Sequence, residues 1–291
     1  MTQIVQSLSE LSHRYDALFV DLWGCMHNGI QAHSEAVSAM QAYRKSGGTV
    51  VLLTNSPKPR KGVEGQLAKF GIPEDAWDTI ATSGDSARAA MYQGAVGQKV
   101  LFMGEWERDA GFFEPLSLIN DGLEIERVSL QEAEGIVCCG PDDPYADPED
   151  NRATFLYAKQ KGLKLLCANP DIVVDRGEKR EWCAGALAEL YTDMGGQSYY
   201  FGKPHPPIYD LARLRLIEIG KEVHDHRILA IGDGVQTDIA GAMGEDIDSL
   251  FITGGLAALE TKTSHQPDET ALTVYLQKEK QHPTYAIGML R

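Results

Sequence analysis

The segment ALFVDLWGCMHNG, residues 17–29, joins four apolar residues to an aspartate and a loop that contains glycine. An apolar run of this length is typical of a strand buried on both faces of a parallel sheet. Ligands of such sheets bind just beyond the carboxyl ends of the strands. Asp21, which ends the run, is therefore a candidate nucleophile or metal ligand. Two residues later, where a second carboxylate would complete an acid–base pair, the chain has Trp23.

The chain on both sides of this segment alternates short apolar runs with helical patterns, which indicates an α/β fold. A helical pattern over residues 34–48 starts with Ser34 as the expected N-cap and ends at glycines. An apolar run over residues 49–55 and a helical pattern over residues 60–73 follow. We therefore expect a doubly wound, Rossmann-like parallel sheet. The same alternation returns later, in residues 198–204, 206–220, 226–234, 236–245 and 248–255.

The middle of the chain interrupts this order with strand and helix patterns of its own. Residues 83–197, about 115 in number, are enough for a separate α/β domain. The whole chain has 291 residues, which is near the size at which a single core stops growing. We predict a core formed by residues 1–82 and 198–291, with residues 83–197 inserted as an α/β cap domain.

Composition narrows the classes of partner and compartment. The net charge of −15 repels nucleic acid and anionic membranes, so neither is an expected partner. The five cysteines lack the short spacing of metal ligands, which fits buried thiols in a reducing compartment. The N-terminal residues do not have the pattern of a secretory signal, and we find no apolar stretch long enough for a membrane span. We expect a cytoplasmic protein.

Polar side chains of complementary chemistry follow the predicted core strands. Because the carboxyl ends of parallel strands share one edge of a sheet, we expect these side chains to lie together. Two carboxylates suit a hard divalent cation such as Mg²⁺, whereas a hydroxyl and an amine suit phosphoryl oxygens. The predicted group consists of Asp21, Thr54, Asn55, Lys203, Asp233 and Asp238.

Each member of this group has an expected role in phosphoryl chemistry. A cation held by Asp21 and Asp233 would neutralise a phosphoryl group and allow the carboxylate of Asp21 to attack phosphorus in line. The hydroxyl of Thr54 would hold phosphoryl oxygens, and Lys203 would offset the charge of the transition state. Asn55, next to Thr54, is a candidate substrate-binding residue. Asp238, one helical turn after Asp233, would orient Lys203 or a metal-bound water.

Four segments of the chain resemble the motifs of a known superfamily. DLWGCMHNG, LLTNS, YYFGKPHPPIYDLA and AIGDGVQTDIAGA look like motifs one to four of the haloacid dehalogenase (HAD) superfamily. ATSGDSARAAM, CANPD and FGKPHP resemble its class IIA branch, the sugar and nucleotide phosphatases related to NagD and p-nitrophenyl phosphatase. The resemblance runs from about residue 15 to residue 255. It implies a HAD core with a C2-type cap that folds over the core and contributes substrate contacts.

The resemblance also implies roles for individual residues. Asp21 would be the nucleophile and would form an aspartyl-phosphate. Asp21, the backbone carbonyl of Trp23, and Asp233 would ligate Mg²⁺, while Thr54 would hold the phosphoryl group and Lys203 would stabilise it. The activity implied is that of a Mg²⁺-dependent phosphoric monoester hydrolase acting on a sugar phosphate, a nucleotide or a similar small metabolite. Caps of this class often take part in homodimer contacts.

Trp23 departs from the superfamily pattern, because its phosphatases usually have an aspartate there. That aspartate protonates the leaving oxygen, and an indole cannot; losing a general acid costs roughly 10²–10⁴-fold in rate. His27, in the same loop, is the local candidate for another proton donor. Three functions follow: an altered phosphatase, a binding protein that has lost turnover, or a dehalogenase-like hydrolase whose halide leaves without a proton. We predict the altered phosphatase, because an idle pocket would not need the nucleophile, hydroxyl, amine and metal carboxylate together.

The cap adds two candidate substrate-binding residues. The segment ANPD, residues 168–171, places Asn169 and Asp171 in a loop after a predicted strand. Such a loop could face the substrate, and the alternative is a turn in which both side chains cap the local backbone.

Overall fold

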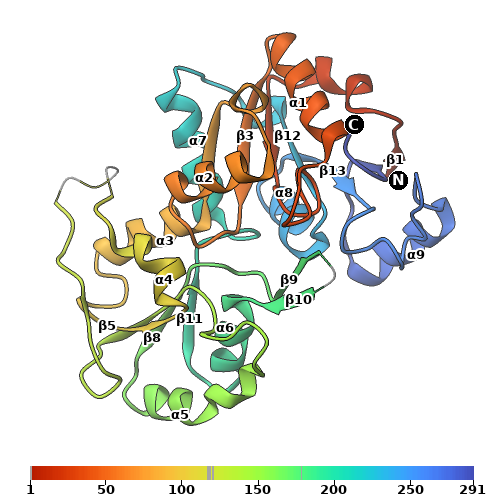
Figure 1. Cartoon of the computed structure of the whole chain (residues 1–291). Helices are drawn as coiled ribbons and strands as arrows, with labels where there is room; N and C mark the ends of the chain where they lie inside the picture. The colour runs from red at the N-terminus through yellow and green to blue at the C-terminus, as the bar shows by residue number, and fades with distance from the viewer. Residues whose placement is uncertain (1, 117–118, 120, 178) are drawn as a thin grey trace. The chain divides into compact units, whose positions relative to one another are not determined.

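The structure is a computed structural model that describes residues 2–116, 119, 121–177 and 179–291 (Figure 1). The chain divides into two compact units. The first unit comprises Met1–Thr54, Gly65–Ala81 and Tyr209–Arg291, and both ends of the chain belong to it. The second unit comprises Asn55–Glu64 and Thr82–Ile208. Each unit is built around its own parallel sheet.

The sheet of the first unit has seven strands in the order β1-β14-β13-β12-β2-β3-β4. Adjacent pairs from β1 to β3 run parallel, and β2, β3 and β12 are buried along their whole length. Their continuous apolar sequences are what a strand covered on both faces requires. The predicted parallel α/β core is confirmed. The strands are β1 (Gln3–Ile4), β2 (Ala17–Val20), β3 (Thr49–Thr54), β4 (Thr79–Thr82), β12 (Ile228–Gly232), β13 (Asp248–Ile252) and β14 (Tyr285–Ile287).

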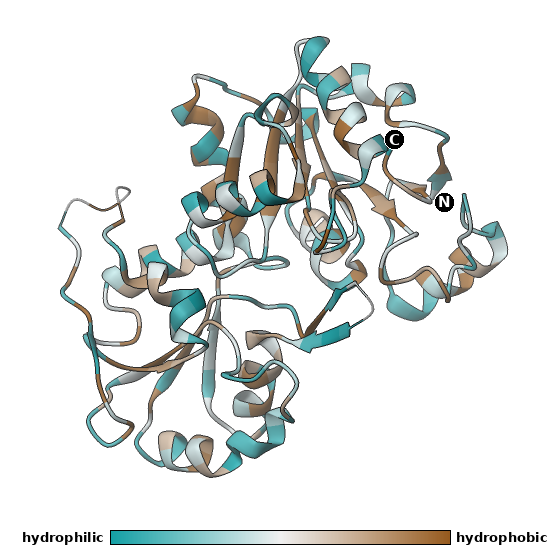
Figure 2. Ribbon diagram, viewed as in Figure 1, coloured by the Kyte–Doolittle hydropathy of each residue, from teal (hydrophilic) through white to brown (hydrophobic). Residues whose placement is uncertain are grey.

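Helices accompany this sheet. In α1, the residues Ala36, Met40 and Tyr43 are buried, which gives the apolar stripe of a helix that packs on a core. The helix begins at Ser34 with His33 as its N-cap, one residue before the expected cap. In Figure 2 the strands of the sheet are mostly hydrophobic, and the helices carry hydrophilic residues between their apolar ones. The helices are α1 (Ser34–Lys45), α2 (Arg60–Phe70), α7 (Pro206–Glu218), α8 (Ala240–Gly244) and α9 (Glu269–Glu279), with short helices η1 (Leu8–Glu10), η2 (Ser12–Arg14), η3 (Glu74–Ala76), η6 (Asp225–Arg227) and the π-helix η7 (Val235–Ile239).

The second unit has a five-stranded sheet in the order β11-β8-β7-β5-β6 and a separate antiparallel pair, β9 and β10. Its core includes Phe155, Leu187 and Tyr191, all fully buried. The strands are β5 (Lys99–Met103), β6 (Glu126–Arg127), β7 (Gly135–Cys138), β8 (Lys164–Cys167), β9 (Val173–Arg176), β10 (Lys179–Trp182) and β11 (Gln197–Tyr200). The helices are α3 (Ser83–Tyr92), α4 (Trp106–Asp109), α5 (Arg152–Gln160) and α6 (Ala184–Asp193), with η4 (Ala110–Phe113) and η5 (Pro148–Asn151).

One predicted strand lies in a different sheet from the one expected. Residues 198–204, which we assigned to the start of the second core segment, overlap β11, and β11 pairs in parallel with β8. Tyr200 stands opposite Cys167 in this pairing. The second unit therefore extends to Ile208 instead of ending at residue 197. The reason is that a short aromatic strand suits either sheet, and only its distant partner decides which one it joins.

Within the described part of the chain, none of the helices has the length and hydrophobicity needed to span a membrane.

A buried ion pair stabilises the start of α3 in the second unit. The guanidinium of Arg88 lies 2.8 Å from Oδ1 of Asp85, and both side chains are almost fully buried. The same guanidinium donates hydrogen bonds to the backbone carbonyls of Phe112 and Glu114. The hydroxyl of Thr82 accepts the N–H of Asp85 at 2.9 Å and caps the helix. Arg88 thus joins α3 to η4 and to the residue that follows it.

We expect Arg88→Ala to lower the free energy of unfolding of the second unit by about 3–5 kcal/mol, because it leaves a buried carboxylate without its guanidinium. Urea unfolding measures the change. The control is Arg152→Ala in the same unit, since Arg152 and its partner Glu149 are more than half exposed. An exposed pair contributes only about 0–1 kcal/mol. Equal losses in the two variants would contradict the prediction.

Candidate functional site

Three neighbouring strand ends in the first unit bring predicted catalytic residues together. Asp21 directly follows β2, Thr54 is the last residue of β3, and Asp233 directly follows β12. The N–H of Asp21 donates to the carbonyl of Ile231 at 2.8 Å, which continues the pairing of β2 with β12. Val20 stands opposite both Ile231 and Leu52, so the three side chains emerge at one edge of the sheet. All three are buried.

The two aspartates form a centre whose donor atoms suit a metal ion. Carboxylate oxygens of Asp21 and Asp233 and the sulfur of Cys25 all lie within 4.8 Å of one another. Glycines leave the space around Asp233: a Cβ at Gly24 would lie 2.1 Å from its Oδ2, and a Cβ at Gly255 would lie 2.0 Å from the same atom. The centre therefore fits a divalent cation held by carboxylates.

Sequence reasoning missed Cys25 as a member of this centre. The residue is 1% exposed and its thiol is not part of a disulfide. The loop after Asp21 turns back on itself, because the N–H groups of Met26 and His27 both donate to the carbonyl of Leu22. This turn brings Cys25 to the two carboxylates. The available signal was its place four residues after the nucleophile in a tight loop, rather than any spacing to other cysteines or histidines.

Trp23 has a packing role in the same loop. The indole lies over Gly29, where a Cβ would come within 2.4 Å of the ring, and Gly29 has a φ of +81° that side chains rarely adopt. The ring meets that of His27 edge to face, with 5.2 Å between the centroids. The backbones of Trp23 and His27 also pair as a bridge. Trp23 therefore supports the loop that follows Asp21.

His27 lies at the centre of the aromatic packing. It is 1% exposed, and its ring also contacts Phe70 at a centroid distance of 4.7 Å. Nδ1 accepts the N–H of Gly29 at 3.0 Å, so the neutral ring carries its proton on Nε2. By accepting the N–H of Gly29 at Nδ1, the neutral ring stabilises the loop directly. The role of proton donor stays a prediction.

Asp238 holds the turn that follows β12. Its Oδ2 accepts the N–H of Gly234 at 3.0 Å. A Cβ at Gly232 would lie 2.0 Å from the carboxyl carbon of Asp238, so the carboxyl group packs directly on the strand end. Oδ2 of Asp233 in turn accepts the N–H of Leu256 at 3.0 Å. Asp238 thus fixes the segment that carries Asp233, and its predicted action on Lys203 or on a water stays a prediction.

The remaining predicted residues belong to the second unit, where Asn55 connects two of them. Oδ1 of Asn55 accepts the N–H of Lys203 at 2.7 Å, and its Nδ2 donates to the carbonyl of Lys203 at 3.2 Å. Nδ2 also donates to Oδ1 of Asp171 at 2.8 Å, and the N–H of Asp171 donates to Oδ1 of Asn169 at 3.1 Å. Gly202 permits this approach, because a Cβ there would lie 2.5 Å from Oδ1 of Asn55.

This network shows a structural role for Asn55. Both ends of its buried amide bind the protein at Lys203 and Asp171, and the substrate contact that we expected stays a prediction. Asn169 acts on the backbone of Asp171, which is the turn-capping alternative considered for this loop. Asn55 is therefore a positioning residue for Lys203.

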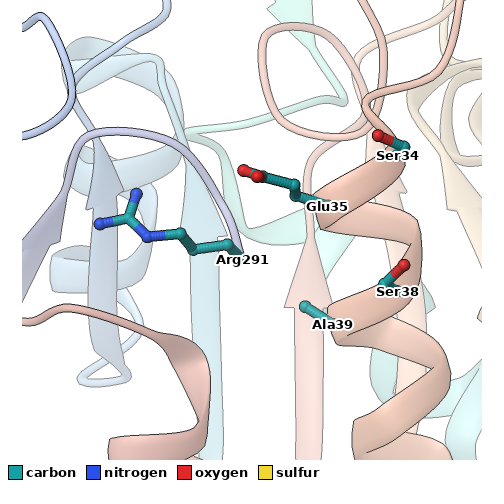
Figure 3. A pocket seen from close by; sticks show the side chains of 5 residues that line it. All are labelled: Ser34, Glu35, Ser38, Ala39 and Arg291. Atoms are coloured by element: carbon teal, nitrogen blue, oxygen red, sulfur yellow. The ribbon is translucent and has the colours of Figure 1, made fainter.

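A pocket of about 400 Å³ elsewhere in the first unit lacks these groups. Glu35 of α1 points toward Arg291 across it (Figure 3). None of the predicted site residues is among the residues that line it, and its lining combines one acid and one arginine with small side chains. The strand-end centre, where two carboxylates lie close together, is therefore the better candidate site. The lining residues are Ser34, Glu35, Ser38, Ala39 and Arg291.

We expect Asn55→Ala to speed hydrogen exchange at the amide of Lys203 about tenfold, because a lost hydrogen bond corresponds to about 0.5–1.5 kcal/mol. Exchange detected by mass spectrometry on peptides that contain Lys203 measures the change. Asn151→Ala is the control, because it removes a single bond to the carbonyl of Pro148 in the same unit. Unchanged exchange in the Asn55 variant would show that the network does not hold Lys203.

Comparisons with known proteins agree with the sequence resemblance. A haloacid dehalogenase-like hydrolase model matches residues 18–113, and a HAD-hydrolase-like model matches residues 200–275. A crystal structure of a haloacid dehalogenase-like hydrolase from Brucella suis 1330 is 38% identical, covers 99% of this chain and 100% of its own, and superposes with a TM-score of 0.85.

Two curated relatives are more distant in sequence. A 5'-nucleotidase of Bacillus subtilis, YutF, is 25% identical over 285 residues, which are 95% of this chain and 96% of that protein. An acid sugar phosphatase of Staphylococcus saprophyticus is 23% identical over 250 residues, which are 84% of this chain and 89% of that protein. Since the similarity to the Brucella hydrolase extends over nearly the whole of both chains, this chain belongs to the HAD superfamily of hydrolases, as its class IIA motifs predict.

Proposed function

We propose that this hydrolase is a Mg²⁺-dependent phosphatase that acts on a small phosphorylated metabolite, with Asp21 as its nucleophile. The observation that carries the proposal is the buried pair of Asp21 and Asp233 at neighbouring strand ends, with glycines around the second carboxylate. A nucleotide or sugar phosphate is the proposed substrate class, because the two curated relatives are a nucleotidase and a sugar phosphatase.

Magnesium fits the donor set of this centre. Asp21 and Asp233 offer carboxylate oxygens, which are hard ligands, and the resemblance adds the backbone carbonyl of Trp23. The replacement of an aspartate by tryptophan at position 23 leaves that carbonyl in the chain. When bound, the ion would neutralise the phosphoryl group that the carboxylate of Asp21 otherwise repels.

Asp21 would transfer the phosphoryl group in two steps. Its carboxylate oxygen attacks phosphorus, and the bond from phosphorus to the leaving oxygen breaks, with the electron pair and then a proton from solvent going to that oxygen. Water next attacks the phosphorus of the aspartyl-phosphate, which releases phosphate and restores the carboxylate. Thr54 would hold a phosphoryl oxygen during both steps, and Lys203 would supply positive charge, as the resemblance implies.

The indole of Trp23 makes the first step depend on the leaving group. It has no acidic proton, and in this loop it packs on Gly29 and His27. An alkoxide that leaves without a proton raises the barrier, whereas an acidic phenol leaves readily. The proposed enzyme is therefore faster on aryl esters than on sugar phosphates or nucleotides, whose turnover is slow or uses a proton from His27 or from the substrate.

We expect release of phosphate from p-nitrophenyl phosphate and from at least one sugar phosphate or nucleotide. Asp21→Asn and chelation of divalent cations should each reduce the rate to background, because they remove the nucleophile and the neutralising charge. Asp16→Asn is the matched control. Asp16 precedes the same strand at its other end and pairs with Arg227 at the surface, so this variant should retain turnover.

The outcomes distinguish the three functions. Phosphate release that is indifferent to both treatments would refute the proposal. Saturable binding of a phosphate ester, measured by calorimetry without turnover, would indicate the binding protein. Release of halide without Mg²⁺ would indicate the dehalogenase.

We expect Trp23→Asp to raise turnover of poor leaving groups more than that of good ones, by up to roughly 10²–10⁴-fold. Rates for a series of aryl and alkyl phosphates, plotted against the pKa of the leaving group, should show a flatter slope in the variant. Trp23→Asn is the control, since it loses the same packing and gains no acid. Slopes that agree between these two variants would mean that the carboxyl group does not act as the acid.

A further inference from the structure

The proposed phosphatase chemistry leaves one member of the metal centre without a role. Sγ of Cys25 lies within 4.8 Å of a carboxylate oxygen of both Asp21 and Asp233. Among the residues that the structure describes, these three form the one set of histidine, cysteine or acidic side chains gathered this closely. Mg²⁺ prefers oxygen ligands, whereas sulfur is a soft ligand that Zn²⁺ and related cations prefer. A thiol beside two carboxylates therefore changes which cation the centre selects.

The dimensions of the centre suit a tetrahedral ion. Zn²⁺ binds sulfur at about 2.3 Å and carboxylate oxygen at about 2.0–2.2 Å, so sulfur and oxygen on one tetrahedral ion lie about 3.6 Å apart. The ligand atoms already lie within 4.8 Å of one another, so each pair has to close by at most about 1.2 Å to reach this spacing. Three protein ligands and one open position are also the usual composition of an accessible zinc site.

We propose that Asp21, Cys25 and Asp233 form a site for a thiophilic divalent cation of the Zn²⁺ type, which displaces Mg²⁺ and inhibits the enzyme. The binding part of this inference stands on the three side chains alone, and the inhibition rests on the proposed phosphatase function. A tetrahedral ion engages Asp21 as a ligand and leaves one open position. Octahedral Mg²⁺ keeps several water-filled positions that phosphoryl oxygens can occupy.

The other cysteines do not obscure a test of this site. All four are buried in the second unit, and none belongs to a described cluster with two further ligands. Burial raises the pKa of the Cys138 thiol to about 12, and burial also raises the pKa of Cys139, Cys167 and Cys183. Because Cys25 is the cysteine that lies in the described group of three possible ligands, a metal–thiolate signal reports on Cys25.

The binding test uses Co²⁺, a spectroscopic substitute for Zn²⁺, and the full chain freed of metal. We expect Co²⁺ to produce a thiolate-to-metal charge-transfer band in the near ultraviolet, together with the visible bands of a tetrahedral ion. Stoichiometric Zn²⁺ should abolish both. Cys25→Ser should lack the charge-transfer band, and the matched control Cys183→Ser should keep it. A band that persists in Cys25→Ser, or that never appears in the unaltered chain, overturns the proposal.

A second measurement needs no variant and so does not depend on how well Cys25→Ser folds. X-ray absorption of the Zn²⁺-loaded chain should show one sulfur neighbour at about 2.3 Å. A shell of oxygen and nitrogen alone would exclude Cys25 as a ligand.

The inhibition has its own readout. The Zn²⁺ concentration that halves phosphate release should rise at least about tenfold in Cys25→Ser, since loss of even an indirect partner of a metal costs 10–100-fold in affinity. An unchanged value overturns the inhibitory role. A Cys25-dependent band in a chain that releases no phosphate refutes the phosphatase and leaves the cation site standing. Phosphate release from a chain that shows no such band refutes the cation site and leaves the proposed phosphatase standing.

Discussion

The pairing of β2 between β12 and β3 is the constraint on which the candidate site depends. Val20 stands opposite Ile231 on one side and Leu52 on the other, and the hydrogen bond from the N–H of Asp21 continues this register past the end of the strand. A one-residue slip would turn every side chain of β2 to the opposite face. The apolar burial of the three strands thus also determines where Asp21, Asp233 and Thr54 emerge.

The sequence predicted the elements that neighbouring residues determine. It did not predict the contacts that depend on residues far away in the chain. The strands β2, β3 and β12 and the helix α1 follow from apolar runs and helical periodicity, and the carboxyl-end rule then indicates Asp21 and Asp233. The sheet that β11 joins depends on β8, about thirty residues earlier in the chain. Cys25 lies in the centre because backbone hydrogen bonds turn the loop back on itself. The hydrogen bonds of the Asn55 amide depend on groups that lie 116 and 148 residues away in the chain. Neither periodicity nor spacing reports such contacts.

In the loop after β2, Trp23 has a packing role at the position where the resemblance implies a catalytic acid. Where the resemblance implies an acid, this chain has an indole that lies on Gly29 and meets His27. His27 in turn contacts Phe70 and accepts a backbone N–H, so the loop is supported by a small aromatic cluster instead of a charged network. The loop also brings the thiol of Cys25 to the carboxylates of Asp21 and Asp233, a group that an oxygen-only centre would not contain.

The hydrogen-bond network around Asn55 has a consequence for folding during synthesis. Its amide joins Lys203, 148 residues later in the chain, and Asp171, 116 residues later. During synthesis the loop after β3 therefore leaves the ribosome long before Asp171 and Lys203 have been added to the chain. Its native hydrogen bonds can form only after that. Contacts of such long sequence separation form late and slow the search for the native state. Until Lys203 has been synthesised, the amide of Asn55 is hydrogen-bonded to water, and the native network replaces that water only at a late stage of folding.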